Sequence, residues 1–130
     1  MTVFPDVEGA VKSYLAQHLT AVEGRVFFGV PDGLPRLPLV TVTLVSGGPQ
    51  RGEAPLTDPR LSLHCWGKTK RDAADAQRAL VGLLHDLRSV RLDAGTWCYG
   101  VTNVSVLWLP DDEARLARYV VDATFTVTAG

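Results

Sequence analysis

The chain has 130 residues, of which 46% are hydrophobic and 21% are charged, and its formal net charge is −1. This length fits one domain, and the composition is that of an ordinary packed protein, which excludes disordered, collagen-like and disulfide-stapled classes. Tight binding to duplex nucleic acid depends on clustered Lys and Arg. Because positive and negative residues are mixed along this chain, the charge balance argues against a protein that binds DNA tightly.

Cys65 and Cys98 are the two cysteines, and each falls within a strand-like segment. Lone thiols of this kind fit a reducing compartment better than a secreted disulfide framework, although one structural disulfide stays open. The first six residues lack a basic stretch followed by an apolar run, and no apolar run approaches the ~20 residues that a membrane span requires. We therefore expect a protein that is made and kept in the cytoplasm and has no membrane partner.

The first predicted element is a helix over residues 7–19, where apolar residues recur every three or four positions. Pro5 and Asp6 suit the first turn of this helix. A short strand is predicted at residues 25–28. The prolines and the glycine between residues 31 and 38 then predict a loop.

Alternating apolar and polar residues predict two paired strands at 39–45 and 61–66. The segment between them, Ser46–Pro59, is long for a hairpin connection, and long loops in compact domains are usually functional or disordered. We expect this arm to contact a partner. Its expected contact residues are Gln50, Arg51, Glu53 and Leu56.

A second amphipathic helix is predicted to begin at Thr69 or Asp72 and to end near Leu87. Full burial of each leucine contributes roughly 1.5 to 3 kcal/mol, so this helix is expected to form a principal part of the core. Its apolar stripe consists of Ala73, Ala76, Leu80, Leu83, Leu84 and Leu87.

Two further strands are predicted at 99–109 and 118–128, joined by a turn that begins at Pro110. The whole chain, residues 1–130, is therefore expected to form one α+β domain in the order α-β-β-β-α-β-β. Its mainly antiparallel sheet would have about five strands, with two helices packed on one face. Strict alternation along the strand 99–109 places Val101 and Thr102 on opposite faces, with Val101 on the face of Asn103.

The sheet face away from the helices is predicted to be mostly neutral and rich in hydroxyl groups. Either this face is simply solvated, as in many antiparallel sheets, or Trp66, Leu107 and Leu109 form a contact between subunits. The predicted members of this face are Thr41, Thr43, Ser62, His64, Trp66, Asn103, Ser105, Leu107, Leu109, Asp122, Thr124 and Thr126.

No spacing of ligand-type or nucleophilic residues meets the requirements of catalysis, metal binding or phosphate binding. His64 and Cys65 are adjacent in a strand, so their side chains point to opposite faces. The glycine-rich segment 47–52 leads into no helix, whereas a phosphate loop requires a helix N-terminus. The acidic turn 111–113 lacks the further oxygen ligands of a calcium loop. We predict no catalytic residue, no metal ligand and no cofactor.

Three segments resemble the tail terminator (tail completion) family of long-tailed double-stranded DNA phages, in an order that covers nearly the whole chain. They are Phe4–Glu8, the segment Cys65–Thr69 followed by Ala73, Ala76 and Leu80, and Arg118–Val127. The resemblance implies a small sheet-and-helix subunit that assembles, usually as a six-fold ring, on the head-proximal end of the completed tail tube. There the ring stops polymerisation and presents a surface to the neck proteins of the head.

The same resemblance implies a non-enzymatic virion protein at the head–tail junction, made in the host cytoplasm. Its implied partners are further copies in a homohexamer, the major tail tube protein, a head–tail connector or stopper protein, and DNA that passes without specific binding. Copies joined head to tail close into a ring if their rotation closes. Besides the arm, the expected contact residues are Trp66, Leu107, Leu109, Asp111, Asp112 and Arg115.

Other functions stay open at this point. Another neck component, such as a stopper, would differ only in the surface that it contacts. A monomeric module could use the open sheet face or its edge to bind a peptide. A small enzyme with an unrecognised site is the third alternative.

Overall fold

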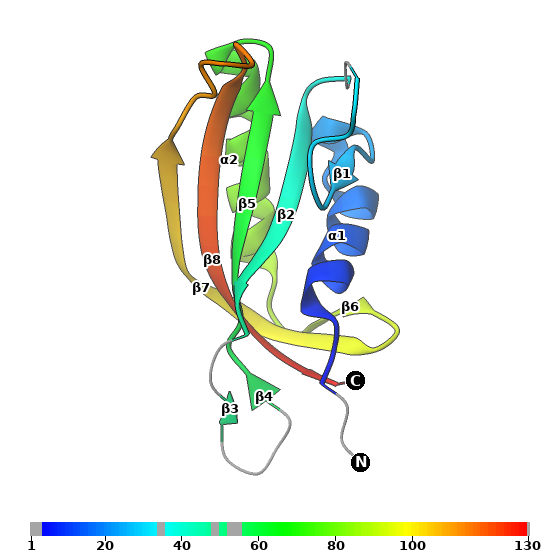
Figure 1. Ribbon diagram of the computed structural model, residues 1–130. Helices are drawn as coiled ribbons and strands as arrows, with labels where there is room; N and C mark the ends of the chain where they lie inside the picture. Colours follow the sequence, from blue (N-terminus) through cyan, green and yellow to red (C-terminus); the bar gives the residue numbers. More distant parts are fainter. Residues whose placement is uncertain (1–3, 34–35, 48–49, 52–55, 130) are drawn as a thin grey trace.

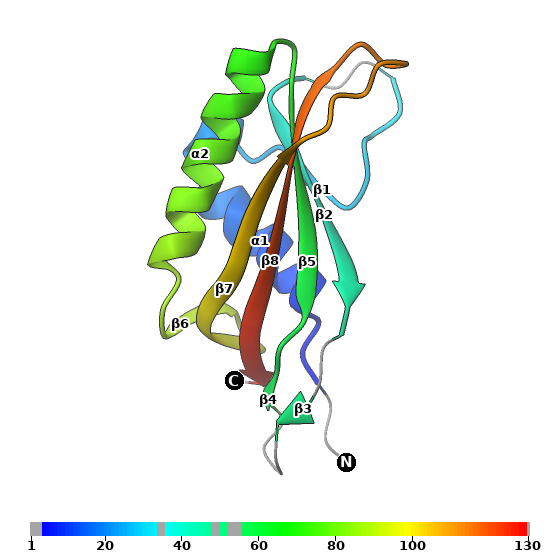
Figure 2. The same cartoon turned by 90° about the vertical axis from the view of Figure 1, so that its left-hand side faces the viewer.

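Two helices pack on one face of a mainly antiparallel sheet (Figures 1 and 2). The computed structural model describes residues 4–33, 36–47, 50–51 and 56–129. The predicted α+β architecture, with both helices on one side of the sheet, is confirmed. In chain order the elements are α1 (Val7–His18), the 3-10 turn η1 (Thr20–Val22), β1 (Val26–Phe27), β2 (Leu39–Ser46), β3 (Gln50–Arg51), β4 (Leu56–Thr57), β5 (Arg60–Gly67), α2 (Lys70–Asp86), β6 (Val90–Asp93), β7 (Thr96–Trp108) and β8 (Ala117–Ala129).

Four long strands form the sheet in the order β2, β5, β8, β7, and each pairs antiparallel with the next. The short β1 adds in parallel to β2, while β6 pairs with the beginning of β7. Figure 1 shows this part of β7 curving across the foot of the sheet. β3, β4 and β6 were not among the predicted strands, because two to four residues are too few for a period-two pattern to be recognised.

The hydrophobic core lies between the two helices and the sheet. Each helix begins at a capped residue: the Asp6 side chain accepts a hydrogen bond from the Gly9 amide (3.1 Å), and Thr69 accepts one from the Asp72 amide (3.2 Å). Of the two predicted starts of the second helix, Thr69 is therefore the cap. The largest fully buried side chains of this core include Phe125, Leu15, Leu61, Leu63, Leu80 and Leu84.

Gly67 ends β5 at the point where the chain turns back into α2. A Cβ atom at this position would lie 2.5 Å from the Ala73 backbone nitrogen and 3.0 Å from the Ala73 Cα. Only a residue without a side chain therefore allows α2 to lie this close to the sheet. The packing of α2 against β5 therefore explains why the segment Cys65–Thr69 contains Gly67.

Two irregularities in β7 change which side chains face the helices. The pairing with β8 shifts between Cys98 and Gly100, and again between Thr102 and Ser105, where Asn103 adopts a positive φ of 54°. Val101 consequently lies opposite the core residue Phe125. The expectation from strict alternation was wrong for Val101 and Thr102, because bulges add residues that alternation does not count.

Candidate interaction surfaces

Neither thiol of this chain is reactive, and the described residues hold no cluster of metal-ligating side chains. Among these residues, no set of three or more His, Cys, Asp and Glu residues could hold a metal ion. Cys65 and Cys98 are free thiols, and burial raises the pKa of Cys65 to about 12 and that of Cys98 to about 11. Thiols with these pKa values stay protonated near neutral pH and are poor nucleophiles. No described helix is long and apolar enough to cross a membrane.

His64 lies on the sheet face away from the helices, while the neighbouring Cys65 lies in the core. The His64 Nε2 atom is 3.2 Å from Ser62 Oγ. Burial lowers the pKa of His64, and the nearby Arg118 guanidinium lowers it further, whereas the Asp122 carboxylate opposes this shift. The imidazole thus lies beside the Ser62 hydroxyl on this face, and the Cys65 thiol is on the other side of the strand. The predicted separation of His64 and Cys65 is confirmed.

The sheet face away from the helices is divided into a covered end and a solvated end. At the covered end, Trp66 is only 6% exposed, its indole N–H donates to Thr41 Oγ1 (3.2 Å), and the Arg118 guanidinium carbon lies 4.8 Å from the centre of its ring. Leu39 and Val120 are buried on the same face. Most of the Trp66 surface is thus used within the domain, which leaves little of it for a contact between subunits.

The remainder of this face carries polar contacts between strands. The Thr126 hydroxyl donates to Asp58 Oδ1 (2.6 Å), and Arg60 forms an ion pair with Asp122 (3.6 Å). These side chains are partly exposed. This end of the face fits the solvated alternative, since polar side chains on an antiparallel sheet commonly face water.

The second half of β7 presents an open apolar surface. Every residue from Thr102 to Leu109 is exposed, on both faces of the strand. Beyond the short β6, this half of β7 pairs only with β8 among the described strands, so its outer edge is unpaired. The exposed large hydrophobic side chains here are Val104 (38%), Val106 (43%), Leu107 (58%), Trp108 (36%) and Leu109 (46%).

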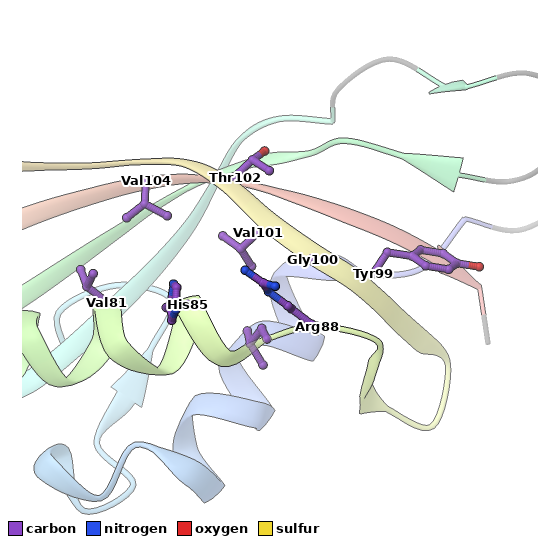
Figure 3. A pocket seen from close by; sticks show the side chains of 9 residues that line it. Val81, His85, Arg88, Tyr99, Gly100, Val101, Thr102 and Val104 are labelled. Atoms are coloured by element: carbon purple, nitrogen blue, oxygen red, sulfur yellow. The ribbon is translucent and has the colours of Figure 1, made fainter.

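A groove of about 360 Å³ separates this strand from α2. Figure 3 shows Val81 of α2 and Val104 of β7 on its opposite walls, with Thr102 pointing to the other side of the strand. Helix α2 packs over β5 and β8, and β7 lies beyond them at the edge of the sheet. The groove therefore results from an edge strand that has no helix of its own.

Basic side chains lie along the side of β7 that faces α2. His85 and Arg88 line the groove, and Lys70, at the other end of α2, places its Nζ atom 4.7 Å from the centre of the Trp108 ring. Lys70 and Arg88 together are called the basic rim. The helical period puts Asp72 and Asp86 on the opposite side of α2. The helix therefore presents its positive side to β7 and its acidic residues elsewhere.

The described strands of the predicted arm, β3 and β4, pair with each other at the foot of the molecule (Figure 1). Strand β4 continues the sheet along β8, where Leu56 pairs with Thr128, and the base is fixed by a hydrogen bond from the Phe125 amide to the Pro59 carbonyl (2.9 Å). Gln50 and Arg51 form β3, which pairs with β4. The predicted contact residue Glu53 lies outside the described residues.

The predicted turn lies at the opposite end of β8 from the arm (Figure 1). Asp111 Oδ1 accepts a hydrogen bond from the Ala114 amide (3.1 Å), while Asp112 and Arg115 are exposed. Leu107 and Leu109 lead into this turn. The predicted contact residues therefore fall into two groups, one at each end of the sheet.

The residues of the groove were missed by sequence reasoning. Val101 was predicted on the face of Asn103, and Val81 was given no role. The bulge that turns Val101 and Val104 to one side has no sequence signal beyond Asn103, a residue type enriched at positive φ. One signal was present: residues 101–110 contain no charged side chain. Such a strand lacks the charges that usually protect an edge.

Comparison with known proteins shows a likeness in fold. No protein-family model matches the chain, and no curated protein sequence matches it. A solved structure described as "Virion of native gene transfer agent (GTA) particle" contains a chain with a similar fold, at a TM-score of 0.58 and 19% sequence identity. The similarity covers 96% of this chain and 98% of the other. The two chains therefore share one fold over their whole length.

Proposed function

We propose that this protein is a structural component of a phage-like virion that forms a ring on the head-proximal end of the tail tube. The ring would end tube polymerisation and offer the joining surface for the head. It would act through its shape, without making or breaking bonds. Its partners would be further copies of itself, the tail tube protein and a connector or stopper protein.

The observation that carries this proposal is the full-length likeness to a chain of the gene transfer agent particle. At 19% identity this likeness concerns the fold, so the assignment to a virion is our inference. It agrees with the resemblance of three segments of the sequence to tail terminators. The described residues include no metal cluster, and burial raises the pKa of both thiols.

The arrangement of surfaces supports the same proposal. A ring subunit needs contacts to two neighbours, to the tube below and to the head above. This chain offers an open apolar edge along β7, the arm at one end and the exposed turn 110–116 at the other. We assign the arm and the turn to the two axial partners, with Gln50, Arg51, Glu53 and Leu56 on one side and Asp111, Asp112 and Arg115 on the other.

Tail tubes assembled from the major tail protein of the same genome provide the test. With the wild-type protein, electron microscopy should show tubes of one length, each with a ring on one end. Deletion of Gln50–Leu56 should leave the domain folded, because β4 contributes only a short pairing at the end of β8, yet it should impair capping. Tubes of uniform length with the deletion variant, or of variable length with the wild type, would contradict the proposal.

The stopper alternative predicts a different result in the same experiment. A stopper would bind the head-side connector and leave tube length unchanged. A peptide-binding module would bind neither. Incubation of the protein with tubes and with tail-less heads, in separate reactions, distinguishes the three functions.

A further inference from the structure

We propose that the open edge of β7 and the adjoining groove receive the next copy of the chain, in a head-to-tail contact that propagates around the ring. The inference rests on the proposed function and assigns the contact between neighbouring subunits to one surface. The groove is the receiving half, and a different surface of the next copy is the inserted half. The contact includes backbone pairing along β7.

The backbone of β7 is prepared for this pairing. The Leu109 amide donates to the Arg118 carbonyl at 3.0 Å, which makes Leu109 and Arg118 a hydrogen-bonded pair. Antiparallel ladders alternate between bonded and non-bonded pairs, so the N–H and C=O groups of Val106 and Trp108 point away from β8. These groups form the row that an added strand would use.

The side chains beside these outward backbone groups favour contact with another protein surface over contact with water. Leu107 (58% exposed) and Val106 (43%) lie on opposite faces of β7, so an added strand would cover apolar surface on both faces. Natural edge strands are usually blunted by charges, by proline or by a covering element. Residues 102–109 contain no charge and no proline, and none of the described elements covers them. A permanently solvated edge would not be expected to keep this composition.

Charge decides between two geometries of self-association. If two β7 edges met each other around a two-fold axis, the basic rims formed by Lys70 and Arg88 would be brought together and would repel. Setting Lys70 and Arg88 aside leaves a formal charge of −3 (−1 − 2) on the remaining residues. A head-to-tail contact therefore places the two cations against a different and, on average, more acidic part of the next copy, and contacts of this kind close into rings if their rotation closes.

The other edge of the sheet supports the same geometry. There β1 covers Val40 and Thr41 of β2, and the Glu8 carboxylate accepts a hydrogen bond from the Leu44 amide at 2.6 Å. Each copy thus has one open edge and one protected edge among its described strands. An asymmetric pair of edges fits a contact that uses two different surfaces.

Two matched substitutions test the edge. Leu107→Lys places a charge on the open edge, whereas Val45→Lys, at a side chain that is 52% exposed on β2, places the same charge on the protected one. Both variants should fold, because both sites are exposed. On tail tubes, Leu107→Lys should reduce the number of tube ends that carry a ring about tenfold, the equivalent of a 1.4 kcal/mol loss in binding, while Val45→Lys should behave as the wild type. Equal behaviour of the two variants would overturn the inference.

Val106→Pro tests the backbone pairing itself. The Val106 N–H points outward, so proline removes a group that β8 does not use. We expect a folded protein, checked by its circular dichroism and thermal midpoint, with the same loss of rings. A folded Val106→Pro variant that forms rings as the wild type does would show that no strand adds to β7.

Charge reversal tests the rim. The double variant Lys70→Glu, Arg88→Glu should lose ring formation, whereas Arg71→Glu, on the solvent side of the same helix, should retain it. Rings formed equally by both would overturn the role of the rim.

Failure of this inference can be told apart from failure of the proposed function. If wild-type rings form and limit tube length but Leu107→Lys forms them equally well, the function stands and the contact lies elsewhere. If the wild-type protein does not bind tubes, sedimentation at high protein concentration measures its self-association instead. Self-association that Leu107→Lys abolishes would support the contact without the tail function, and a monomeric wild type would overturn both.

Discussion

The two edges of the sheet differ in how their backbone groups are satisfied. On the β2 edge, a short parallel strand and the Glu8 carboxylate cover the outward amides of Val40 and Leu44. On the β7 edge, eight consecutive residues, 102–109, are exposed and none is charged. An unpaired apolar edge attracts further strands, and proteins that are not meant to assemble protect both edges. The contrast supports our proposal that one edge is closed within the domain and the other is used for assembly.

The largest expected effect is a loss in the free energy of unfolding when a core side chain between the two edges of the sheet is truncated. Phe125 in β8 is fully buried, so Phe125→Ala should lower the free energy of unfolding by about 3 to 5 kcal/mol. Leu107→Ala on the open edge should change it by less than about 0.5 kcal/mol in the isolated subunit. Urea unfolding of the two variants measures both values. A comparable loss at Leu107 would mean that the open edge is part of the core of the domain.

A smaller effect is expected where α2 is set against the sheet. Gly67→Ala should cost about 1 to 3 kcal/mol, because the new methyl group would meet the Ala73 backbone and push α2 away from β5. Gly82→Ala, in the same helix with open space around the site, should stabilise the protein by about 0.5 to 1 kcal/mol. Thermal unfolding of the pair gives the comparison. Stabilisation by both substitutions would contradict the close approach of helix and strand.

The protected edge can be opened by one substitution. Glu8→Ala removes the acceptor of the Leu44 amide and should cost about 0.5 to 1.5 kcal/mol, the usual net contribution of an intramolecular hydrogen bond. Glu23→Ala is the control, because Glu23 is 66% exposed and forms only a surface ion pair with Arg25. We expect Glu8→Ala, but not Glu23→Ala, to increase self-association in light scattering. Unchanged stability and association of Glu8→Ala would show that this edge needs no cover.

The smallest effect concerns pH. Because burial and Arg118 lower the pKa of His64 in the folded protein, the unfolded chain takes up this proton first as the pH falls through the ordinary histidine range near 6.5. The wild type should therefore lose stability on acidification, and His64→Gln should lose less. Urea unfolding at about pH 8 and about pH 5 measures the difference. Parallel losses in the two proteins would contradict the lowered pKa.

The sequence predicted most of the fold because its main elements are long and regularly patterned. The stripes of α1 and α2 and the alternation in β2, β5 and β8 each extend over enough residues to define a period, and their predicted bounds agree closely with the structure. The short strands β3 and β6 have no such pattern. In β7 the two bulges broke the alternation, so Val101 was placed on the wrong face.

The interaction surfaces were less predictable. Trp66 appeared as an exposed aromatic on an open face, yet Arg118 and Thr41, distant in sequence, cover it. The open edge of β7 depends on which strand ends the sheet, which is a property of topology. Leu107 and Leu109 were predicted as contact residues from their alternation alone, and they lie on that edge. Whether they touch another subunit stays a prediction.

Electron cryomicroscopy of tail tubes bearing the bound protein tests the central claim most directly. We expect a closed ring in which the β7 edge of each copy, from Thr102 to Leu109, is covered by its neighbour. Single bound copies, or a ring in which this edge faces solvent, would contradict the account.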